Sequence, residues 1–133
     1  MQNTLRLIHW APRIISILAI CFIGMFATDA FNSTESFSNQ LKDFFLHLIP
    51  TFILLGILVL AWAKELVGGI IFATLGLGLA PFIYQHNYTL NHSILTSLSV
   101  ILVINGPFIL TGFLFILSHF TKKKNTPTNS NKN

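Results

Sequence analysis

The fold of this chain is decided by residues 44–84, which read FFLHLIPTFILLGILVLAWAKELVGGIIFATLGLGLAPFIY. Two apolar runs, residues 44–63 and 67–84, are joined there by a short polar turn around Lys64 and Glu65. Each run is close to the roughly 20 apolar residues that an α-helix needs to cross the hydrocarbon core of a bilayer. Because the turn is so short, the two runs are predicted to form an antiparallel helical hairpin.

The composition of the whole chain excludes most soluble classes of protein. Of its 133 residues, 53% are apolar and only 9% are charged, whereas a typical soluble domain has about 25% charged residues. This excludes a soluble globular enzyme, a disordered chain and a coiled coil, and leaves an integral membrane protein. The net charge of +4 comes mostly from lysines near the C-terminus and does not indicate a nucleic-acid partner. The single cysteine, Cys21, excludes an intramolecular disulfide.

Two further apolar runs, residues 10–31 and 93–120, complete a set of four predicted spans. The last run has 28 residues, or about 42 Å as a straight helix, which exceeds the roughly 30 Å of the hydrocarbon core. Gly106 and Pro107 stand in its middle, and a kink is predicted there because proline removes a backbone donor. We therefore expect residues 1–121 to form an all-α, integral membrane four-helix bundle, with a hairpin between spans two and three and a kinked fourth span.

The basic residues are distributed unevenly over the two predicted sides of the membrane. One side has only Lys42. The other side has seven basic residues, namely Arg6, Arg13, Lys64, Lys122, Lys123, Lys124 and Lys132. An excess of lysine and arginine marks the cytoplasmic side. The chain is therefore predicted to lie in the cell inner (cytoplasmic) membrane as a multi-pass protein with both termini in the cytoplasm, and residues 122–133 to be a disordered basic cytoplasmic tail.

One alternative changes the number of spans. Residues 14–27 could be the apolar core of a cleaved signal peptide, although the stretch at 28–30 matches a cleavage site poorly. Cleavage would leave three spans, with the C-terminus still inside.

Small residues recur at helical spacing in the third predicted span. Gly69, Ala73, Gly76 and Ala80 are 4, 3 and 4 residues apart, which places all four on one helical face. In membranes, such a face lets two helix backbones approach closely. We interpret it as a packing face, and the sequence leaves open whether the partner helix belongs to the same chain or to a second copy.

Three polar residues are candidates for a functional role. Asn105 is the one strongly polar residue near the centre of a span, where it could bond a neighbouring helix, satisfy a carbonyl freed by the kink, or contact a transported solute. His47 and Asp29 lie at span ends on the outer side, which also holds His86 and His92, and such side chains can bind metals or move protons. Their spacing matches no metal motif, so interfacial side chains satisfied by water are the favoured interpretation.

The charged residues near the cytoplasmic side have simpler interpretations. Arg13 could pair with an acidic residue inside the bundle, but its place at the membrane edge favours extension of its guanidinium into the interface. Lys64 and Glu65 are expected to form a solvated turn. Lys122–Lys124 are expected to act as a topology signal with weak attraction to anionic lipid.

Several short motifs together resemble a known family. They are Arg13-Ile-Ile-Ser-Ile17, Asp29-Ala-Phe31, His47-Leu-Ile-Pro-Thr51, Ala61-Trp62 with Lys64-Glu65 and Gly68-Gly69, and Gly106-Pro107 before LTGFLF at 110–115. Over about residues 5–120 this pattern is similar to that of small prokaryotic four-helix membrane proteins classed as a domain of unknown function, of a kind found in Bacteroidota-like bacteria. The resemblance implies a bacterial inner-membrane location and carries no activity, because the family has none assigned.

The leading hypothesis is therefore a small integral membrane protein that is not an enzyme and acts as an accessory or helix-packing interaction protein. We expect no cofactor and no metal. The expected partners are the lipid bilayer and either a second copy or another membrane protein. Two alternatives stay open: a homo-oligomeric channel or transporter for a small solute or ion, with the break at Asn105 as its site, and an outer-face metal or proton-transfer site using His47 and Asp29.

Overall fold

The computed structural model describes residues 2–31 and 36–125. Within these residues every element is helical, which confirms the all-α prediction. The elements, in chain order, are α1 (Gln2–Met25), the short 3₁₀ helix η1 (Phe26–Ala30), α2 (Phe37–Ala63), α3 (Glu65–Asn91), α4 (Ile94–Ile104) and α5 (Gly106–Asn125).

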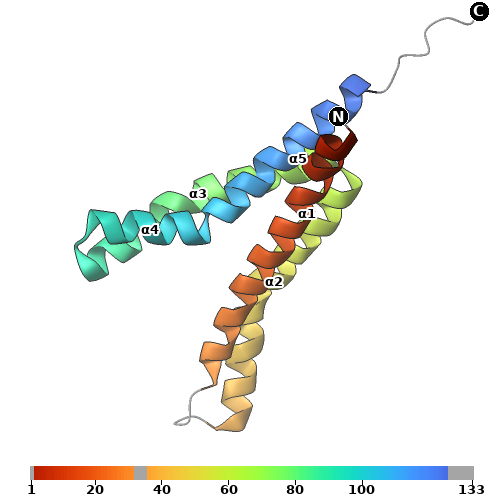
Figure 1. Cartoon of the computed structure of the whole chain (residues 1–133). Helices are drawn as coiled ribbons and strands as arrows, with labels where there is room; N and C mark the ends of the chain where they lie inside the picture. The colour runs from red at the N-terminus through yellow and green to blue at the C-terminus, as the bar shows by residue number, and fades with distance from the viewer. Residues whose placement is uncertain (1, 32–35, 126–133) are drawn as a thin grey trace, which may run out of the picture.

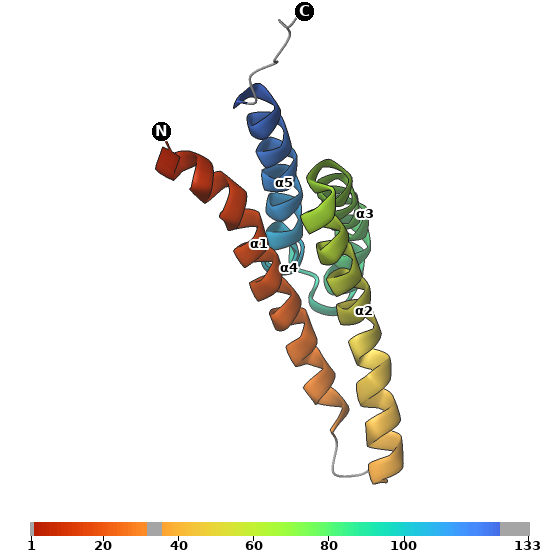
Figure 2. The same ribbon diagram turned by 90° about the vertical axis from the view of Figure 1, so that its right-hand side faces the viewer.

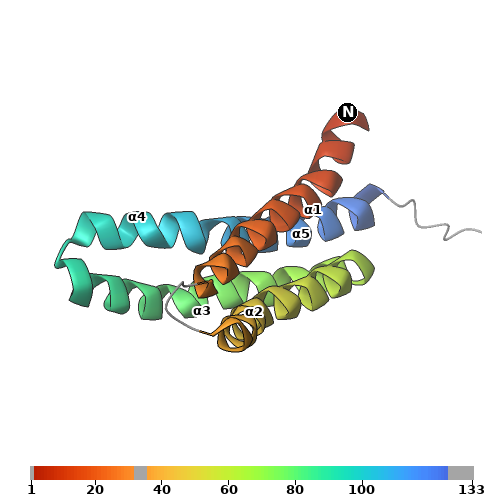
Figure 3. The ribbon, with the colours of Figure 1, turned by 90° about the horizontal axis from the view of Figure 1, so that it is seen from below.

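The helices form two hairpins that diverge from a common end (Figure 1). The first hairpin consists of α1, η1 and α2, and the second consists of α3 with α4 and α5. The start of α1, the α2–α3 turn and the end of α5 lie together at what we call the closed end, whereas the far tips of the two hairpins point apart (Figures 1 and 2). Seen from below, α3 runs alongside both α4 and α5, and α1 crosses over α5 (Figure 3). Contacts between the hairpins are therefore concentrated toward the closed end.

Three helices are long and apolar enough to cross a membrane, and a fourth span results if α4 and α5 are counted together. The bend between α4 and α5 is 44° and falls at Asn105, where the sequence predicts a kink. Pro107 cannot donate a backbone hydrogen bond, which accounts for a break at this point.

Several helices extend beyond the predicted spans. α2 begins at Phe37, within the link expected before residue 44, and α3 continues to Asn91 through most of the link expected at 85–92. Polar residues can stay helical there because the backbone bonds remain internal, and Asn87 Nδ2 even donates to the Ile83 carbonyl 2.9 Å away. The expectation of disorder from residue 122 is wrong for its first part, since α5 runs to Asn125. Residues 126–133 lie outside the described residues.

Aromatic stacking forms the centre of the second hairpin. Phe72 on α3 lies between Phe108 and Phe115 on α5, with ring centroids 6.2 and 6.3 Å apart and ring planes within 10° of parallel. All three rings are buried. Residues seven apart on α5 lie two turns apart on the same face, so one ring of α3 fills the space between them.

Glycine allows helix backbones to approach closely within the second hairpin and at the turn that joins the two hairpins. A Cβ atom added at Gly112 of α5 would lie 2.5 Å from the Ala73 nitrogen and 2.7 Å from the Gly69 oxygen of α3. At the α2–α3 turn a Cβ at Gly68 would lie 2.3 Å from Ala61 Cα. Only one residue, Lys64, separates α2 from α3, so the end of α2 and the beginning of α3 must lie this close together.

Candidate functional site

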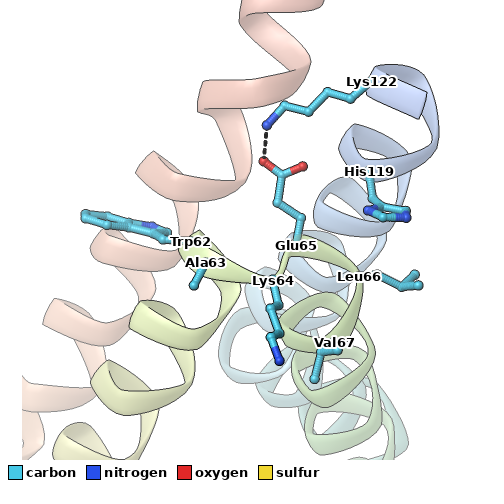
Figure 4. A pocket seen from close by; sticks show the side chains of 8 residues that line it. All are labelled: Trp62, Ala63, Lys64, Glu65, Leu66, Val67, His119 and Lys122. Atoms are coloured by element: carbon cyan, nitrogen blue, oxygen red, sulfur yellow. Dashed lines mark hydrogen bonds and ion pairs between the residues drawn. The ribbon is translucent and has the colours of Figure 1, made fainter. Parts of the chain in front are cut away.

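A charged cluster occupies the interior of the closed end. Glu65 is only 7% exposed, and its Oε1 atom lies 2.9 Å from Arg13 Nη2 and 2.7 Å from Lys122 Nζ. His9 Nδ1 lies 3.1 Å from the same oxygen, and the Ser118 hydroxyl donates to Oε2 at 3.1 Å. We call these five residues the Glu65 cluster. Figure 4 shows the Lys122 ammonium reaching across to the Glu65 carboxylate.

Three helices supply the side chains of this cluster. His9 and Arg13 are one turn apart on α1, Ser118 and Lys122 are one turn apart on α5, and Glu65 is the first residue of α3. Each pair is spaced four residues apart, which points both side chains to the same side of its helix. The single carboxylate therefore joins the beginning, the middle and the end of the chain.

The surroundings of Arg13 hold its side chain in place. Its Nη1 donates to the His9 carbonyl, and its guanidinium carbon lies 5.7 Å from the centroid of the Phe115 ring. The Ser16 hydroxyl donates to the Arg13 carbonyl at 2.9 Å. With Lys122, Arg13 supplies two positive charges against one carboxylate, an arrangement suited to holding helices or an anion rather than to nucleophilic chemistry.

The cluster corrects two expectations from the sequence. Glu65 is not part of a solvated turn, because α5 covers the start of α3, and Arg13 pairs with an acid instead of extending into the interface. One signal in the sequence pointed to this pair: Glu65 is the only acidic residue on the side that carries seven basic residues. An arginine within an apolar run has no other carboxylate to meet there.

Asn105 makes a bond between helices. It is 2% exposed, and its Nδ2 donates to the Gly76 carbonyl of α3 at 2.9 Å. Its own carbonyl accepts from the backbone nitrogens of Phe108 and Ile109, both at 3.0 Å, so it begins the next helix as well. Of the three roles that the sequence allows for Asn105, the structure shows the interhelical hydrogen bond.

Replacing Asn105 with alanine is expected to lower the free energy of unfolding by about 1 kcal/mol, because a buried interhelical hydrogen bond contributes roughly that much. Unfolding by sodium dodecyl sulfate in mixed micelles measures the change. Asn87→Ala is a matched control, because that amide bonds a carbonyl of its own helix, and it should shift the transition by less than half as much. Equal shifts for both variants would contradict a special role for Asn105.

The residues of the predicted packing face lie mostly against α5. Gly69 and Gly76 are buried, and Cβ atoms added there would lie 2.9 Å and 2.6 Å from the side chains of Ile116 and Ile109. Ala73 contacts Gly112, and Ala80 is half-buried farther along α3. For its first three residues, the partner helix belongs to the same chain. Gly106 and Pro107 begin α5 and are half-buried at the bend.

Asp29 lies in η1 at the tip of the first hairpin, and His47 lies within the first half of α2, away from the Glu65 cluster. Both are exposed, and His47 Nδ1 is 2.7 Å from the Asp43 carbonyl oxygen of its own helix. His86 and His92 belong to the tip of the second hairpin, which points away from the first (Figure 1). Within residues 2–31 and 36–125 no three histidine, cysteine, aspartate or glutamate side chains are close enough to hold a metal ion.

No curated protein and no solved structure matches this chain. One family model, described as Domain of unknown function (DUF7670), matches residues 1–127. The match confirms the resemblance to a domain of unknown function that the short motifs indicated. Because it covers nearly the whole sequence, and with it both hairpins and the Glu65 cluster, the chain belongs to the DUF7670 family.

Proposed function

We propose that this protein is a multi-pass component of the cell inner membrane, with both termini in the cytoplasm, and that it acts as an accessory protein by packing against another membrane-spanning helix. The Glu65 cluster would hold its two hairpins together at the cytoplasmic face. The far tips of the hairpins would lie toward the opposite face, together with Asp29 and His47.

The distribution of exposed side chains supports a membrane location. Large apolar side chains are exposed on α2, α3 and α4, among them Val59 (66%), Phe82 (77%) and Leu102 (73%). Exposed apolar surface of this extent is unfavourable in water and favourable against lipid tails or a partner helix. The closed end carries the basic residues that the positive-inside rule assigns to the cytoplasm.

The observation that carries the interaction role is the apolar space left between the hairpins. On one face a pocket of about 180 Å³ is lined by Ile23 and Leu54 of the first hairpin and by Leu79 of the second. On another face a groove of about 330 Å³ lies between Leu18 of α1 and Val103 of α4. Helices of a complete bundle would fill such spaces themselves, so the diverging hairpins offer sites for an additional apolar helix.

Photocrosslinking in intact cells tests this role. A photoreactive amino acid placed at Leu18 or Leu79 should give a crosslinked product of one defined mass, corresponding either to two copies of this chain or to one copy with a second membrane protein. The same amino acid at Val59 or Leu102, which are similarly exposed but line neither space, serves as the control. Monomer crosslinked only to lipid at all four positions would contradict an interaction role.

The packing role is favoured over conduction by a homo-oligomer. Asn105 uses its amide to hold α3, and the pocket beside it is otherwise lined by apolar side chains. A path for ions or polar solutes needs polar groups directed into it. Solute flux in proteoliposomes that Asn105→Ala changes would instead favour the channel.

A further inference from the structure

The exposed charge at the closed end has one sign. Among the described residues, the exposed charged side chains there are all basic: Arg6, Lys64, Lys122, Lys123 and Lys124. The carboxylate at this end, Glu65, is buried and held by Arg13 and Lys122. The other described acids, Asp29 and Asp43, belong to the tip of the first hairpin. The closed end therefore presents a cationic surface.

A cleft opens in this surface beside the α2–α3 turn. Its volume is about 480 Å³, and its wall includes Lys64 from the turn, Trp62 from the last turn of α2, and His119 and Lys122 from α5 (Figure 4). The Lys122 ammonium is turned toward Glu65, 2.7 Å away, whereas the Lys64 side chain extends from the turn in the opposite direction (Figure 4). Two cationic side chains from different elements thus border one open space.

The cleft continues into apolar surface along the helices. Leu66 and Val67 line its side, and Ile70, which is half-exposed, follows one turn later on α3. On α2, Val59 is exposed one turn before Trp62. Tryptophan is favoured where headgroups meet lipid tails, because its ring is apolar and its nitrogen is polar. A free inorganic anion would use the cations alone, whereas a phospholipid would use both the cations and the apolar surface.

We propose that this cleft binds an anionic phospholipid through its headgroup. The Lys64 ammonium lies beside the phosphate, the Lys122 side chain borders the other part of the cleft, and the acyl chains follow the apolar surface of α2 and α3 below Trp62. This inference rests on the proposed membrane location. It assigns to Lys64 a role in lipid selection, in addition to marking the cytoplasmic side.

Quenching of tryptophan fluorescence by brominated lipids provides the test. The chain has two tryptophans, so Trp10→Phe leaves Trp62 as the only fluorophore. The protein is reconstituted in phosphatidylcholine vesicles that contain either brominated phosphatidylglycerol or brominated phosphatidylcholine at the same mole fraction. Brominated phosphatidylglycerol should quench the fluorescence of Trp62 several-fold more than brominated phosphatidylcholine does. Lys64→Gln should reduce that selectivity by about fivefold, the factor that corresponds to one basic residue near an anionic surface.

Control measurements distinguish a failure of the proposed lipid site from a failure of the proposed membrane location. Lys42→Gln removes an exposed lysine from the far tip of α2 and should leave the selectivity unchanged. An equal loss in both variants, or equal quenching by the two lipids, would overturn the lipid site while leaving the membrane location intact. Absence of quenching by either lipid would contradict the membrane location itself. Loss of the selectivity in inorganic phosphate, but not in chloride of the same ionic strength, would assign the cleft to a free phosphate anion and overturn the proposal.

Discussion

Replacement of Glu65 by glutamine is expected to lower the free energy of unfolding by about 3 kcal/mol, the largest effect of any single side-chain change considered for this protein. Glutamine fills the same space but carries no charge, so Arg13 remains buried without a counter-charge. Breaking a buried ion pair by removing one partner is costly because the other partner stays desolvated. Unfolding of the purified protein by sodium dodecyl sulfate in mixed micelles, followed by circular dichroism, measures the change.

Two further variants locate the cause of this loss. Asp43→Asn removes an exposed carboxylate at the far tip of α2 and should change stability by less than about 0.5 kcal/mol. Replacing both Arg13 and Glu65 with methionine should recover part of the stability, since apolar residues of similar volume often substitute well for a buried pair. A transition for Glu65→Gln that coincides with that of Asp43→Asn would show that the cluster does not hold the hairpins together.

Substitution of Gly68 by alanine is expected to destabilise the fold almost as much, by about 3 kcal/mol, because the new methyl group would overlap the backbone of α2. Its position lies 2.2 Å from Ala61 Cβ and 2.3 Å from Ala61 Cα, distances that only a separation of the two helices can relieve. Overpacking of this kind typically costs about 1–3 kcal/mol, and here the obstacle is backbone that has no alternative rotamer. The same detergent unfolding assay measures the effect.

Gly56 offers a matched control for this prediction. It lies in α2, and apart from its chain neighbours and the nearby backbone of its own helix, no atom lies within 4 Å of a Cβ atom added there. Gly56→Ala should therefore leave the fold intact and raise its stability by up to about 1 kcal/mol, the difference in helix propensity between the two residues. If Gly68→Ala and Gly56→Ala changed the stability equally, α2 and α3 would have to lie farther apart at the turn than the structure shows.

Much of the fold could be predicted from hydrophobic runs alone. The run at 44–63, the turn and the run at 67–84 indicate a helical hairpin, because each apolar run has about the length that a helix needs to cross a bilayer and only a short polar turn joins them. The bend at Asn105 could also be predicted, since Pro107 lacks a backbone donor wherever it lies. The ends of the helices could not be predicted. A polar residue such as Asn87 is compatible with both a helix and a loop, and whether the helix continues through it depends on the adjacent helical turns.

The Glu65 cluster could not be predicted from local sequence patterns. Whether Glu65 is buried depends on where α5 ends, and α5 begins more than forty residues later in the chain. A charged residue at a turn between spans is usually in water, so the sequence alone favours exposure. The divergence of the hairpins was equally hidden, because no periodicity in the sequence predicts it.

The composition of the Glu65 cluster also sets an order of assembly during biosynthesis. Arg13 precedes Glu65 by 52 residues, so this contact can form as soon as α3 emerges from the ribosome. Ser118 and Lys122 follow Glu65 by 53 and 57 residues and are synthesised last. A nascent chain that ends after α3 can thus form the Arg13–Glu65 pair, and only the end of translation adds the Ser118 hydroxyl and the Lys122 ammonium that complete the cluster. Chains truncated before residue 118 lack both of these late contacts.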